Sequence, residues 1–349
     1  MKIGLIGCGN IAAYHLNAIL RHKGVESLSV TDIDRQKAED IARRFRISNV
    51  YNDSAAMLRK EKPHAVHILT PPASHAGLAI QAMDSGCHVL VEKPMAMTID
   101  EADSVIAAAK KNGVKLCVDH TYLFDPFITK AWQLVQTGKV GRVIHVETYY
   151  SFDLVRFRGL DTAFQSQEHW CFSLPGGLLL DSLPHPLSVL LHFVKDPVNL
   201  WAVKKSNGIL PEGLPDELRI LVESEDATGS VSVSLGTRPD CFAVNIYGSE
   251  MSLHLNLSNM TLVRRKNRHL PKKLFRVVDT VDQAAQLLYG ASSNTLKVLL
   301  GRIQPPGDIG PVIKKFYESL ENGSEPPVTG EAGKMVVKFM SEIWKQATP

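Results

Sequence analysis

A glycine-rich turn close to the start of the chain constrains the fold more than any other feature of the sequence. The apolar run 3–6 reads as a buried strand, residues 7–12 (GCGNIA) follow it, and apolar periodicity from residue 12 to residue 20 predicts a helix. Gly7 allows a tight turn, Gly9 lets the backbone approach a pyrophosphate, and Ala12 keeps the helix close to the strand. The pattern predicts a dinucleotide-binding unit, and the plainer alternative is a tight strand-to-helix turn in another α/β fold.

An acidic residue supports the dinucleotide interpretation. Asp32 ends the second predicted strand, 28–31, and lies 23 positions after Gly9, where a carboxylate can bind the ribose hydroxyls. A carboxylate would repel the 2′-phosphate of NADP, although Arg35 lies nearby. We therefore expect NAD, with NADP possible, bound by Gly7, Gly9, Asn10, Ile11 and Asp32.

Short apolar runs alternate with helical patterns over the first 120 residues. Helices are predicted at 12–20, 35–45, 76–85 and 99–111, and strands at 3–6, 28–31, 65–69, 88–91 and 115–118. Thr98 and Glu101 form a capping box for the last of these helices. This alternation is typical of βαβ units, so residues 1–122 are expected to form a Rossmann domain, a doubly wound parallel sheet with helices on both faces.

Strands with a period of two dominate the rest of the chain. They are predicted at 142–150, 200–205, 218–223, 229–235, 242–247 and 251–257. Short polar turns between them indicate an open, mainly antiparallel sheet. Helices are predicted at 126–137, 186–194, 309–320 and 330–346. Residues 123–349 are therefore expected to form an α+β domain that binds substrate and mediates oligomerisation.

Composition and charge exclude several classes of protein. Lys and Arg number 39 and Asp and Glu number 36, a net charge of +3, which is too small for the basic footprint of a nucleic-acid-binding protein. No apolar run approaches the roughly 18–20 residues of a membrane span. The five cysteines show no C-x-x-C spacing and the histidines no H-E-x-x-H spacing, so no metal is assigned. We expect a cytoplasmic protein without nucleic-acid or membrane partners.

Two further motifs carry a resemblance to a known family. Residues 68–75 (ILTPPASH) precede a predicted helix, and residues 86–94 (GCHVLVEKP) place a Glu-Lys-Pro sequence after a buried strand. Together with the glycine loop, these motifs resemble the Gfo/Idh/MocA family, the relatives of glucose–fructose oxidoreductase and inositol dehydrogenase. The resemblance implies that Thr70, Pro71 and His75 line the nicotinamide side of a cofactor site.

Lys93 is the first candidate catalytic residue. It follows the strand 88–91 at its carboxyl end, where open α/β sheets place their ligands. The resemblance implies that Glu92 and Lys93 lie beside the nicotinamide ring, where a lysine can polarise a substrate oxygen or stabilise its charge. From position alone, a surface lysine in a turn is an equally good interpretation.

A second candidate pair lies in residues 176–186 (GGLLLDSLPHP). Asp181 and His185 are four residues apart and would share one face of a helix, and the resemblance implies such an Asp–His pair. His185 would accept a proton, and Asp181 would orient the imidazole or bind a substrate hydroxyl. The prolines leave a second possibility open, in which Asp181 or Ser182 caps a helix starting near Leu183 and His185 is a core residue.

These features predict an NAD(P)-dependent dehydrogenase acting on CH–OH groups, which transfers a hydride between the nicotinamide and a ring hydroxyl or ketone. The expected substrate is a sugar, a sugar nucleotide or a cyclitol, bound by Lys93, Tyr122, Asp181 and His185. The alternatives are an NAD-dependent glycosidase that acts by oxidation and elimination, and a non-catalytic dinucleotide-binding regulatory protein. The exposed face of an open sheet predicts a homo-dimer or homo-tetramer.

Residues 264–273 (RRKNRHLPKK) carry six Lys or Arg in ten residues. We interpret this basic stretch as a solvated hairpin and loop. The alternative is an anion site for a nucleotide diphosphate or for a partner subunit.

Overall fold

The computed structural model describes residues 1–153, 170–174, 176–210, 214–301 and 306–346. The chain forms two compact units. The first unit comprises residues 1–121 and 309–341, and the second comprises residues 122–308 together with the C-terminal residues from 342 onward. The chain first passes between the units next to the predicted boundary, and it then returns to the first unit near its C-terminus.

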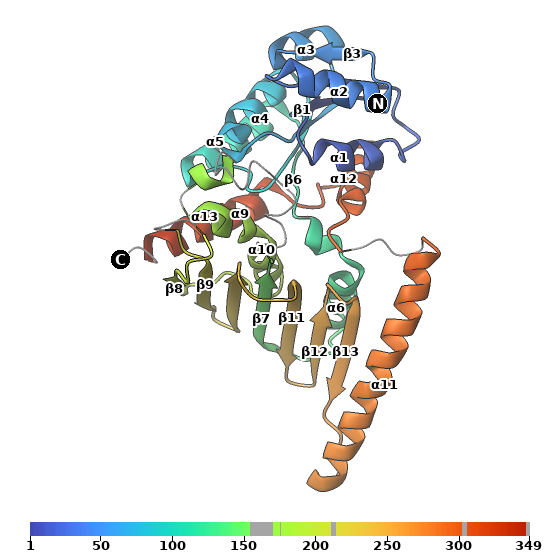
Figure 1. Ribbon diagram of the computed structural model, residues 1–349, viewed down its shortest axis with the longest axis vertical. Coiled ribbons are helices and arrows are strands. Elements are labelled where there is room, and N and C mark those ends of the chain that lie inside the picture. The colour runs from blue at the N-terminus through green and yellow to red at the C-terminus, as the bar shows by residue number, and fades with distance from the viewer. Residues whose placement is uncertain (154–169, 175, 211–213, 302–305, 347–349) are drawn as a thin grey trace. The chain divides into compact units, whose positions relative to one another are not determined.

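A parallel sheet forms the core of the first unit (Figure 1). It has six strands in the order β3-β2-β1-β4-β5-β6. This is the strand order of dinucleotide-binding Rossmann folds, in which strands are added in one direction from β1 to β3 and in the other direction from β4 to β6, so that the order reverses between β1 and β4. The central strands are apolar and almost completely buried, as a sheet covered on both faces requires. The strands are β1 (Lys2–Ile6), β2 (Ser27–Thr31), β3 (Asn49–Tyr51), β4 (Ala65–Ile68), β5 (His88–Val91) and β6 (Leu116–Val118).

Helices follow the strands of this sheet, and α2, α3 and α5 begin at side-chain caps. Asp34 caps α2 through the backbone N–H groups of Gln36 and Lys37, and Thr98 and Glu101 form the predicted capping box of α5. The helices are α1 (Ala12–Ile19), α2 (Arg35–Phe45), α3 (Ser54–Glu61), the 3₁₀ turn η1 (Pro72–Ser74), α4 (His75–Asp84), α5 (Ile99–Asn112), α12 (Gly310–Asn322) and α13 (Gly330–Gln346).

The sequence analysis assigned α12 and α13 to the second domain, whereas the structure packs α12 and most of α13 against the first unit. The start of α13 approaches β6 so closely that a Cβ atom at Gly333 would lie 2.6 Å from a methyl group of Val118. Tyr317 and Phe316 of α12 are fully buried. Apolar periodicity predicted both helices, but it carries no information about which sheet they cover.

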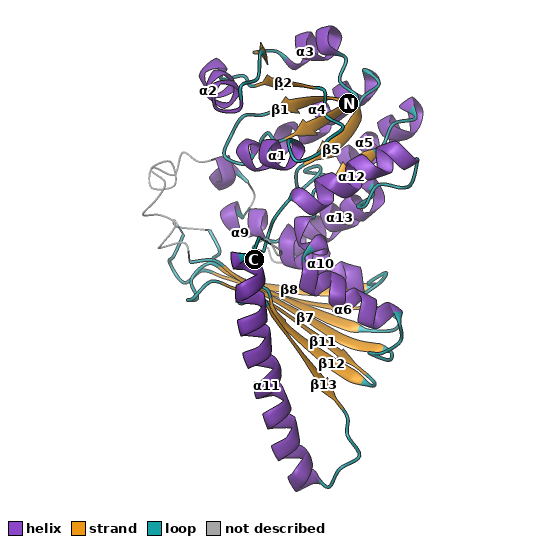
Figure 2. Cartoon of the chain, turned by 90° about the vertical axis from the view of Figure 1, so that its right-hand side faces the viewer, coloured by secondary structure: helices purple, strands orange, loops and turns teal. Residues whose placement is uncertain are grey.

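The second unit is built on a seven-stranded sheet in the order β13-β12-β11-β7-β10-β9-β8. β7 and β10 are parallel and the other neighbours are antiparallel, so the prediction of an open, mainly antiparallel sheet is confirmed. α6 and α10 cover one face, and α11 runs along β13 (Figure 2). The strands are β7 (Val143–Ser151), β8 (Asn199–Lys205), β9 (Glu217–Glu223), β10 (Thr228–Ser234), β11 (Cys241–Gly248), β12 (Met251–Asn256) and β13 (Thr261–Lys266). The helices are η2 (Thr121–Phe124), α6 (Pro126–Gln136), η3 (Trp170–Ser173), α9 (Gly177–Ser182), α10 (Pro184–Phe193) and α11 (Lys272–Leu299).

The largest difference from the sequence prediction is α11, a helix of 28 residues that was not expected. The basic stretch 264–273 is therefore the end of β13, a short turn and the start of α11, and not a hairpin and loop. Arg265 pairs with Asp279 and Arg268 pairs with Asp282, so part of its charge is neutralised. Within the described residues, none of the helices is long and apolar enough to cross a membrane.

Candidate functional site

The glycine loop lies at the reversal point of the parallel sheet, between β1 and α1. Gly7 has φ +100°, and a Cβ atom there would lie 2.8 Å from the backbone carbon of Leu69, so only glycine fits. A Cβ atom at Gly9 would meet nothing within 4 Å, so the space over this residue is open to a ligand. The N-cap position of α1 is Ile11, whose side chain cannot accept a hydrogen bond from the first helical N–H groups. Asn10 is exposed next to it.

Asp32 is fixed against the glycine loop by two backbone N–H groups. Cys8 donates to Oδ2 at 2.7 Å, and Asp34 donates to Oδ1 at 2.9 Å. The carboxylate therefore has a defined orientation beside the loop, at the end of β2. Arg35 donates to Glu39 of its own helix at 2.7 Å, so the guanidinium is engaged along α2.

The segment that contains Thr70 and Pro71 follows β4 and is tied to the segment after β5 by His75. His75 is 1% exposed, with Nδ1 2.7 Å from the carbonyl oxygen of Pro94 and Nε2 2.6 Å from that of Thr70. Burial lowers the pKa of His75, against the effect of the two carbonyl groups. A neutral ring can donate to one of these carbonyls at a time. The predicted cofactor-binding His75 is therefore an interior residue that connects two loops.

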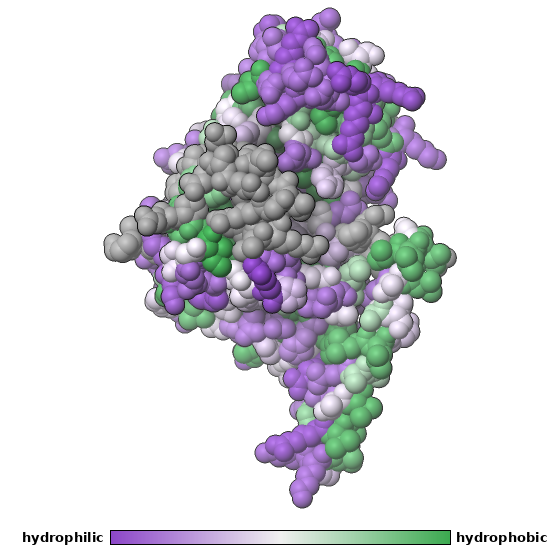
Figure 3. All heavy atoms as spheres, in the orientation of Figure 1, coloured by the Kyte–Doolittle hydropathy of each residue, from purple (hydrophilic) through white to green (hydrophobic). Residues whose placement is uncertain are grey.

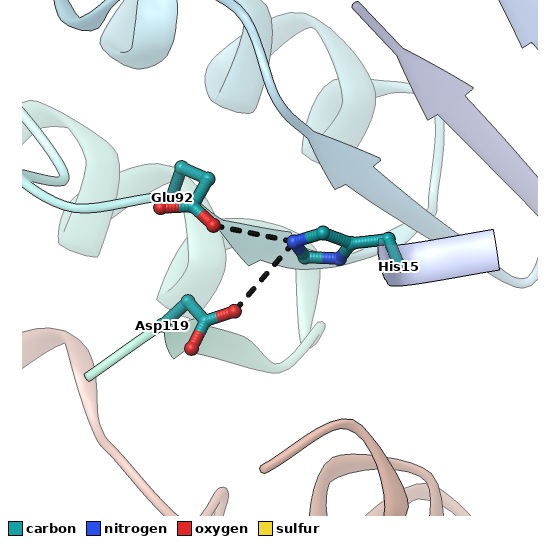
Figure 4. A group of neighbouring side chains, drawn as sticks. All are labelled: His15, Glu92 and Asp119. Atoms are coloured by element: carbon teal, nitrogen blue, oxygen red, sulfur yellow. Dashed lines mark hydrogen bonds and ion pairs between the residues drawn. The ribbon is translucent and has the colours of Figure 1, made fainter. Parts of the chain in front are cut away.

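Glu92 and Lys93 follow β5, and a buried network fixes the Glu92 carboxylate (Figure 4). Oε2 accepts the backbone N–H of Lys93 at 3.2 Å, and Oε1 lies 3.2 Å from Nε2 of His15. The same His15 nitrogen lies 3.7 Å from Oδ2 of Asp119, which follows β6. His15 thus connects the loops after two neighbouring strands.

The network continues from His15 into the interior of the first unit. His15 Nδ1 lies 2.9 Å from Nδ1 of His67, and His67 Nε2 lies 2.8 Å from the hydroxyl of Tyr317. Burial lowers the pKa of His67 well below its ordinary value, so this imidazole is neutral. One proton must lie between the two facing Nδ1 atoms, whichever ring donates it.

Two carboxyl groups in this cluster have opposite pKa shifts. Burial, and next the charge of Glu92, raise the pKa of Asp119 to about 7. Burial also acts to raise the pKa of Glu92, but the hydrogen bond and charge of His15 and the charge of Lys93 outweigh it and lower this pKa. Glu92 is therefore a carboxylate at neutral pH, next to an Asp119 that is partly protonated.

One nitrogen of His15 and one oxygen each of Glu92 and Asp119 lie within 4.8 Å of one another, so the cluster has the donor set of a divalent metal site. No metal was predicted from the sequence, because these three residues are far apart in the chain and form no short-range motif. The hydrogen bond between His15 and Glu92 already uses two of the three donor atoms. We interpret the cluster as a proton-sharing network.

His185, in the second unit, lies in an aromatic setting at the start of α10. Its ring centre is 5.1 Å from that of Tyr122 in an edge-to-face arrangement and 5.7 Å from that of Tyr150. Phe242 packs against both tyrosines, at 4.7 and 5.2 Å. Burial raises the pKa of Tyr122 to about 12 and that of Tyr150 further, so both phenols are protonated. Tyr150 donates a hydrogen bond to the hydroxyl oxygen of Tyr122.

Asp181 belongs to the same neighbourhood. Its charge contributes to the raised pKa of Tyr150, which also contacts the His185 ring. Helical backbone continues from α9 into α10, because Leu183 has φ −58° and ψ −38° and bonds to Leu179 on one side and Leu187 on the other. Leu183, and not Asp181 or Ser182, is the N-cap residue of α10. The alternative of a cap at those residues is therefore wrong, and Asp181 and His185 share one helical face.

The sequence analysis missed the residues that support its candidates. Three residues that contact or adjoin a candidate were not named as site residues: His15, Asp119 and Tyr150. Tyr317, which was also not named, is connected to Glu92 only through His67 and His15. Asp119 offered a usable signal, because it follows a parallel strand at its carboxyl end, as Glu92 does. His15 offered a weaker signal, since a fully buried histidine in a short apolar helix requires a polar partner.

Two family models match the chain. A model described as an oxidoreductase family with an NAD-binding Rossmann fold matches residues 1–120, and the GFO/IDH/MocA C-terminal domain model matches residues 128–254. One model matches residues of the first unit and the other matches residues of the second, and they confirm the predicted fold class and NAD as the cofactor of the first domain.

Relatives with known names agree with these models. A 1-carboxy-3-chloro-3,4-dihydroxycyclohexa-1,5-diene dehydrogenase from Comamonas testosteroni is 32% identical over 54% of this chain and 46% of that protein. A D-xylose 1-dehydrogenase (NADP(+)) 2 from Haloferax volcanii is 24% identical over 99% of this chain and 97% of that protein. A solved levoglucosan dehydrogenase in complex with NADH and levoglucosan superposes with a TM-score of 0.79 at 20% identity, over 99% of this chain and 97% of that one.

Several curated relatives align over 37% to 61% of their own length, so the chain spans about half the length of these proteins. The domains matched by the family models are nevertheless both present here, in the same order as the two units. The chain belongs to the GFO/IDH/MocA family of oxidoreductases.

Proposed function

We propose that this protein is an NAD(P)-dependent dehydrogenase that transfers a hydride between the nicotinamide and a ring hydroxyl or ketone of a carbohydrate or polyol. The observation that carries the proposal is the placement of Lys93 after β5, next to a Glu92 carboxylate that His15 fixes. A cation held at the carboxyl end of a parallel strand is well placed to act on a ligand bound there.

The glycine loop supports dinucleotide binding on its own geometry. Gly7 takes up a conformation that other residues rarely adopt, and the open space over Gly9 suits the close approach of a pyrophosphate. When bound, the cofactor supplies the hydride acceptor. Asp32 would bind the ribose hydroxyls, and the Thr70–Pro71 segment would line the nicotinamide side. His75 would act as a positioning residue for this segment, since its ring is interior.

Asp32 favours NAD over NADP. Its carboxylate is held in place by Cys8 and Asp34 and would repel a 2′-phosphate. Arg35, which could receive a 2′-phosphate, is paired with Glu39 along α2. The Haloferax relative is named for NADP, so cofactor choice varies among relatives, and Asp32 is the residue that we expect to decide it here.

Within the proposed reaction, Lys93 stabilises negative charge on the substrate oxygen and His185 accepts the hydroxyl proton. Asp181 shares a helical face with His185 and orients it or binds a second hydroxyl. The rings of Tyr122, Tyr150 and Phe242 enclose His185, and Tyr122 would offer its phenol to a polyhydroxylated substrate. Donors and acceptors of the kind that sugars and cyclitols require are thus provided by Lys93, Tyr122, Asp181 and His185.

The names of the relatives support a dehydrogenase over the two alternatives. Relatives are named as dehydrogenases of D-xylose and levoglucosan, and neither a glycosidase nor a regulatory protein receives comparable support. The five cysteines are free thiols, and four of them are buried, which supports the expected cytoplasmic location. Whether the substrate is a free sugar, a sugar nucleotide or a cyclitol is decided by experiment.

The test is NADH or NADPH formation by the purified protein across free sugars, cyclitols and nucleotide-linked sugars, each offered with NAD and with NADP. Turnover with one class, and faster turnover with NAD, is the expected result. Asp32→Ser should reduce the preference for NAD, while Asp53→Ser, at the cap of α3, should not change it. Glycoside cleavage without net NADH would overturn the proposal in favour of the glycosidase, and NADH binding without any turnover would favour a regulatory protein.

A further inference from the structure

α11 has one polar face, and this face is bound to its own sheet. Asp279 pairs with Arg265 of β13 at 2.8 Å, and Asn294 donates to the backbone carbonyl of Met260 at 2.7 Å. Gln286 both donates to and accepts from the backbone of Arg264. These bonds lie along one side of the helix, so the rotation of α11 about its axis is fixed.

The opposite side of α11 is apolar and exposed. Six large apolar side chains on this side are 45% to 78% exposed: Leu274, Val277, Val281, Leu287, Leu288 and Leu299. Figure 3 shows hydrophobic side chains gathered along this helix. A helix of 28 residues is about 42 Å long at 1.5 Å per residue. A continuous apolar stripe of this length is typical of a surface that another helix covers.

The stripe has the spacing of a coiled coil. The residues along the stripe are separated alternately by three and by four positions through the whole helix, which is a heptad pattern. The a positions are Leu274, Val281, Leu288 and Thr295. The d positions are Val277, Ala284, Ala291 and Val298. Among the a, d, e and g positions of α11, Lys273 alone carries a charge.

We propose that α11 is an association helix that pairs antiparallel with α11 of a second copy of this chain. In an antiparallel pair, a positions face d positions. With the two-fold axis at residue 286, near the middle of the helix, Leu288 faces Ala284 and Val281 faces Ala291, while Leu274 faces Val298. Each of the central layers then joins a large and a small side chain, which is the arrangement that fills a core evenly.

The parallel arrangement fits less well. It would set Leu288 against Leu288 and Ala284 against Ala284, so wide and narrow layers would alternate. It would also bring together the basic N-terminal residues Lys272, Lys273 and Arg276 of the two copies. The antiparallel pair instead places these residues beside the C-terminus of the partner helix, where the helix dipole is negative. Shape and charge therefore both favour the antiparallel pair.

The open face of the seven-stranded sheet, from which a homo-oligomer was predicted, ends at β13 under α11, which is bound to that face through Arg265 and turns its own apolar stripe away from the sheet. That face exposes Trp201, Val203 and Leu221 on β8 and β9, whereas α11 runs along β13 at the other end of the sheet. The inference does not depend on the proposed enzymatic activity. It predicts that a defined part of any assembly depends on α11 alone.

The first test is the molar mass of the full-length protein in solution, measured by light scattering after size-exclusion chromatography. Val281→Glu with Leu288→Glu would bury one carboxylate in each of the four central layers of the pair, so the mass is expected to fall to half. Tyr289→Glu with Leu296→Glu is the matched control: these exposed residues lie on the same helix, outside the a and d positions. The control should keep the mass of the unmodified protein, and far-ultraviolet circular dichroism should show that both variants are folded.

The second test determines the direction of pairing. Mild oxidation of a mixture of Ala284→Cys and Leu288→Cys proteins should give a disulfide-linked heterodimer, whereas either protein alone should give little linked product. Efficient linkage of Leu288→Cys alone would indicate a parallel pair and overturn the antiparallel arrangement. A monomeric unmodified protein, or an unchanged mass in the first variant, would overturn association through α11. If the unmodified protein is a monomer that sediments with anionic phospholipid vesicles, and Val281→Glu with Leu288→Glu abolishes this sedimentation, the surface binds a membrane and not a second copy.

Discussion

At the carboxyl ends of the parallel strands in the first unit, side chains are connected by charge and by shared protons. His15 lies within hydrogen-bonding or ion-pair distance of Glu92 and Asp119. The contacts continue from His15 into the core through the rings of His67 and Tyr317. In the second unit, His185 is surrounded instead by the rings of Tyr122 and Tyr150. Burial shifts pKa values in both regions, and in the first region the charges of Glu92 and His15 act on the shifted groups as well.

The difference has consequences for substitution. In the charged region, changing one residue shifts the pKa of the others, because the charge of Glu92 contributes to the raised pKa of Asp119. Burial is the largest cause of the raised pKa of Asp119 and of both tyrosines, but His185 is not among the causes of either tyrosine shift. Replacing His185 should therefore remove one function and leave its surroundings intact. Replacing a member of the charged network should change several properties together.

The largest effect is expected from His185→Asn. The variant keeps a polar side chain of similar shape but cannot accept a proton, so kcat should fall by about 10²- to 10⁴-fold. NADH affinity, measured by fluorescence titration, should stay the same, because the glycine loop belongs to the other unit. His192→Asn is the matched control: it lies on the same helix, where its ring packs on Trp132, and should keep kcat within about twofold. Equal losses in the two variants would contradict the role of His185.

Lys93→Met should have the next largest effect. Methionine keeps much of the length of the side chain and removes its charge, so kcat should fall by about 10²- to 10³-fold, as for the loss of one group that stabilises a developing oxyanion. Lys110→Met, which removes an exposed ion pair with Glu331, should leave kcat unchanged. Near-normal turnover of Lys93→Met on the true substrate would refute the proposed role.

Much of the first unit could be predicted because its signals are local. The strand after Lys2, the capping box at Thr98 and the glycine loop each depend on residues within a few positions of one another. The contacts of His15 with Glu92 and Asp119 could not be predicted this way, since they join residues 77 or more positions apart. Such pairs form only when the order of the strands is known.

In the second unit, a regular local pattern did not predict which face of a helix is buried. α11 has a regular heptad, but its stripe carries Ala284, Ala291 and Thr295 among larger residues, and its bound face is polar. The usual expectation that a helix buries its apolar face against its own domain fails here, because the polar face packs on β13. The sequence also left open whether Asp181 and His185 share one helical face, because two prolines lie within the first turn of α10.

The third prediction concerns stability and pH in the charged region. The pKa of Asp119 is raised to about 7 in the folded protein, against about 3.9 for an unperturbed aspartic acid. Between these values the folded state binds the proton and the unfolded state does not, so the free energy of unfolding falls as pH rises through this window. Asp119→Asn does not titrate. Its free energy of unfolding, relative to the unmodified protein, should therefore rise by about 2 kcal/mol between pH 5 and pH 7.

Asp125 provides the comparison in the second unit. Burial raises its pKa to about 6, against hydrogen bonds from the N-terminal N–H groups of α6. The relative stability of Asp125→Asn should therefore stop rising near pH 6, while that of Asp119→Asn should continue to rise to about pH 7. Urea unfolding at pH values from 4.5 to 8 distinguishes the two curves. A flat difference for Asp119→Asn would show that this carboxyl group is not held protonated by its surroundings.

The smallest effect is expected from Tyr150→Phe, which tests how the aromatic region is held together. The variant keeps the ring contacts with His185 and Phe242 and removes the hydrogen bond that Tyr150 donates to Tyr122. A buried hydrogen bond contributes roughly 0.5–1.5 kcal/mol, so the free energy of unfolding should fall by about 1 kcal/mol. Tyr149→Phe, the neighbouring residue on the other face of β7, loses an exposed bond to Thr237 and should change stability less. If Tyr150→Phe leaves the free energy of unfolding unchanged, the phenol pair adds nothing, and ring packing alone positions His185.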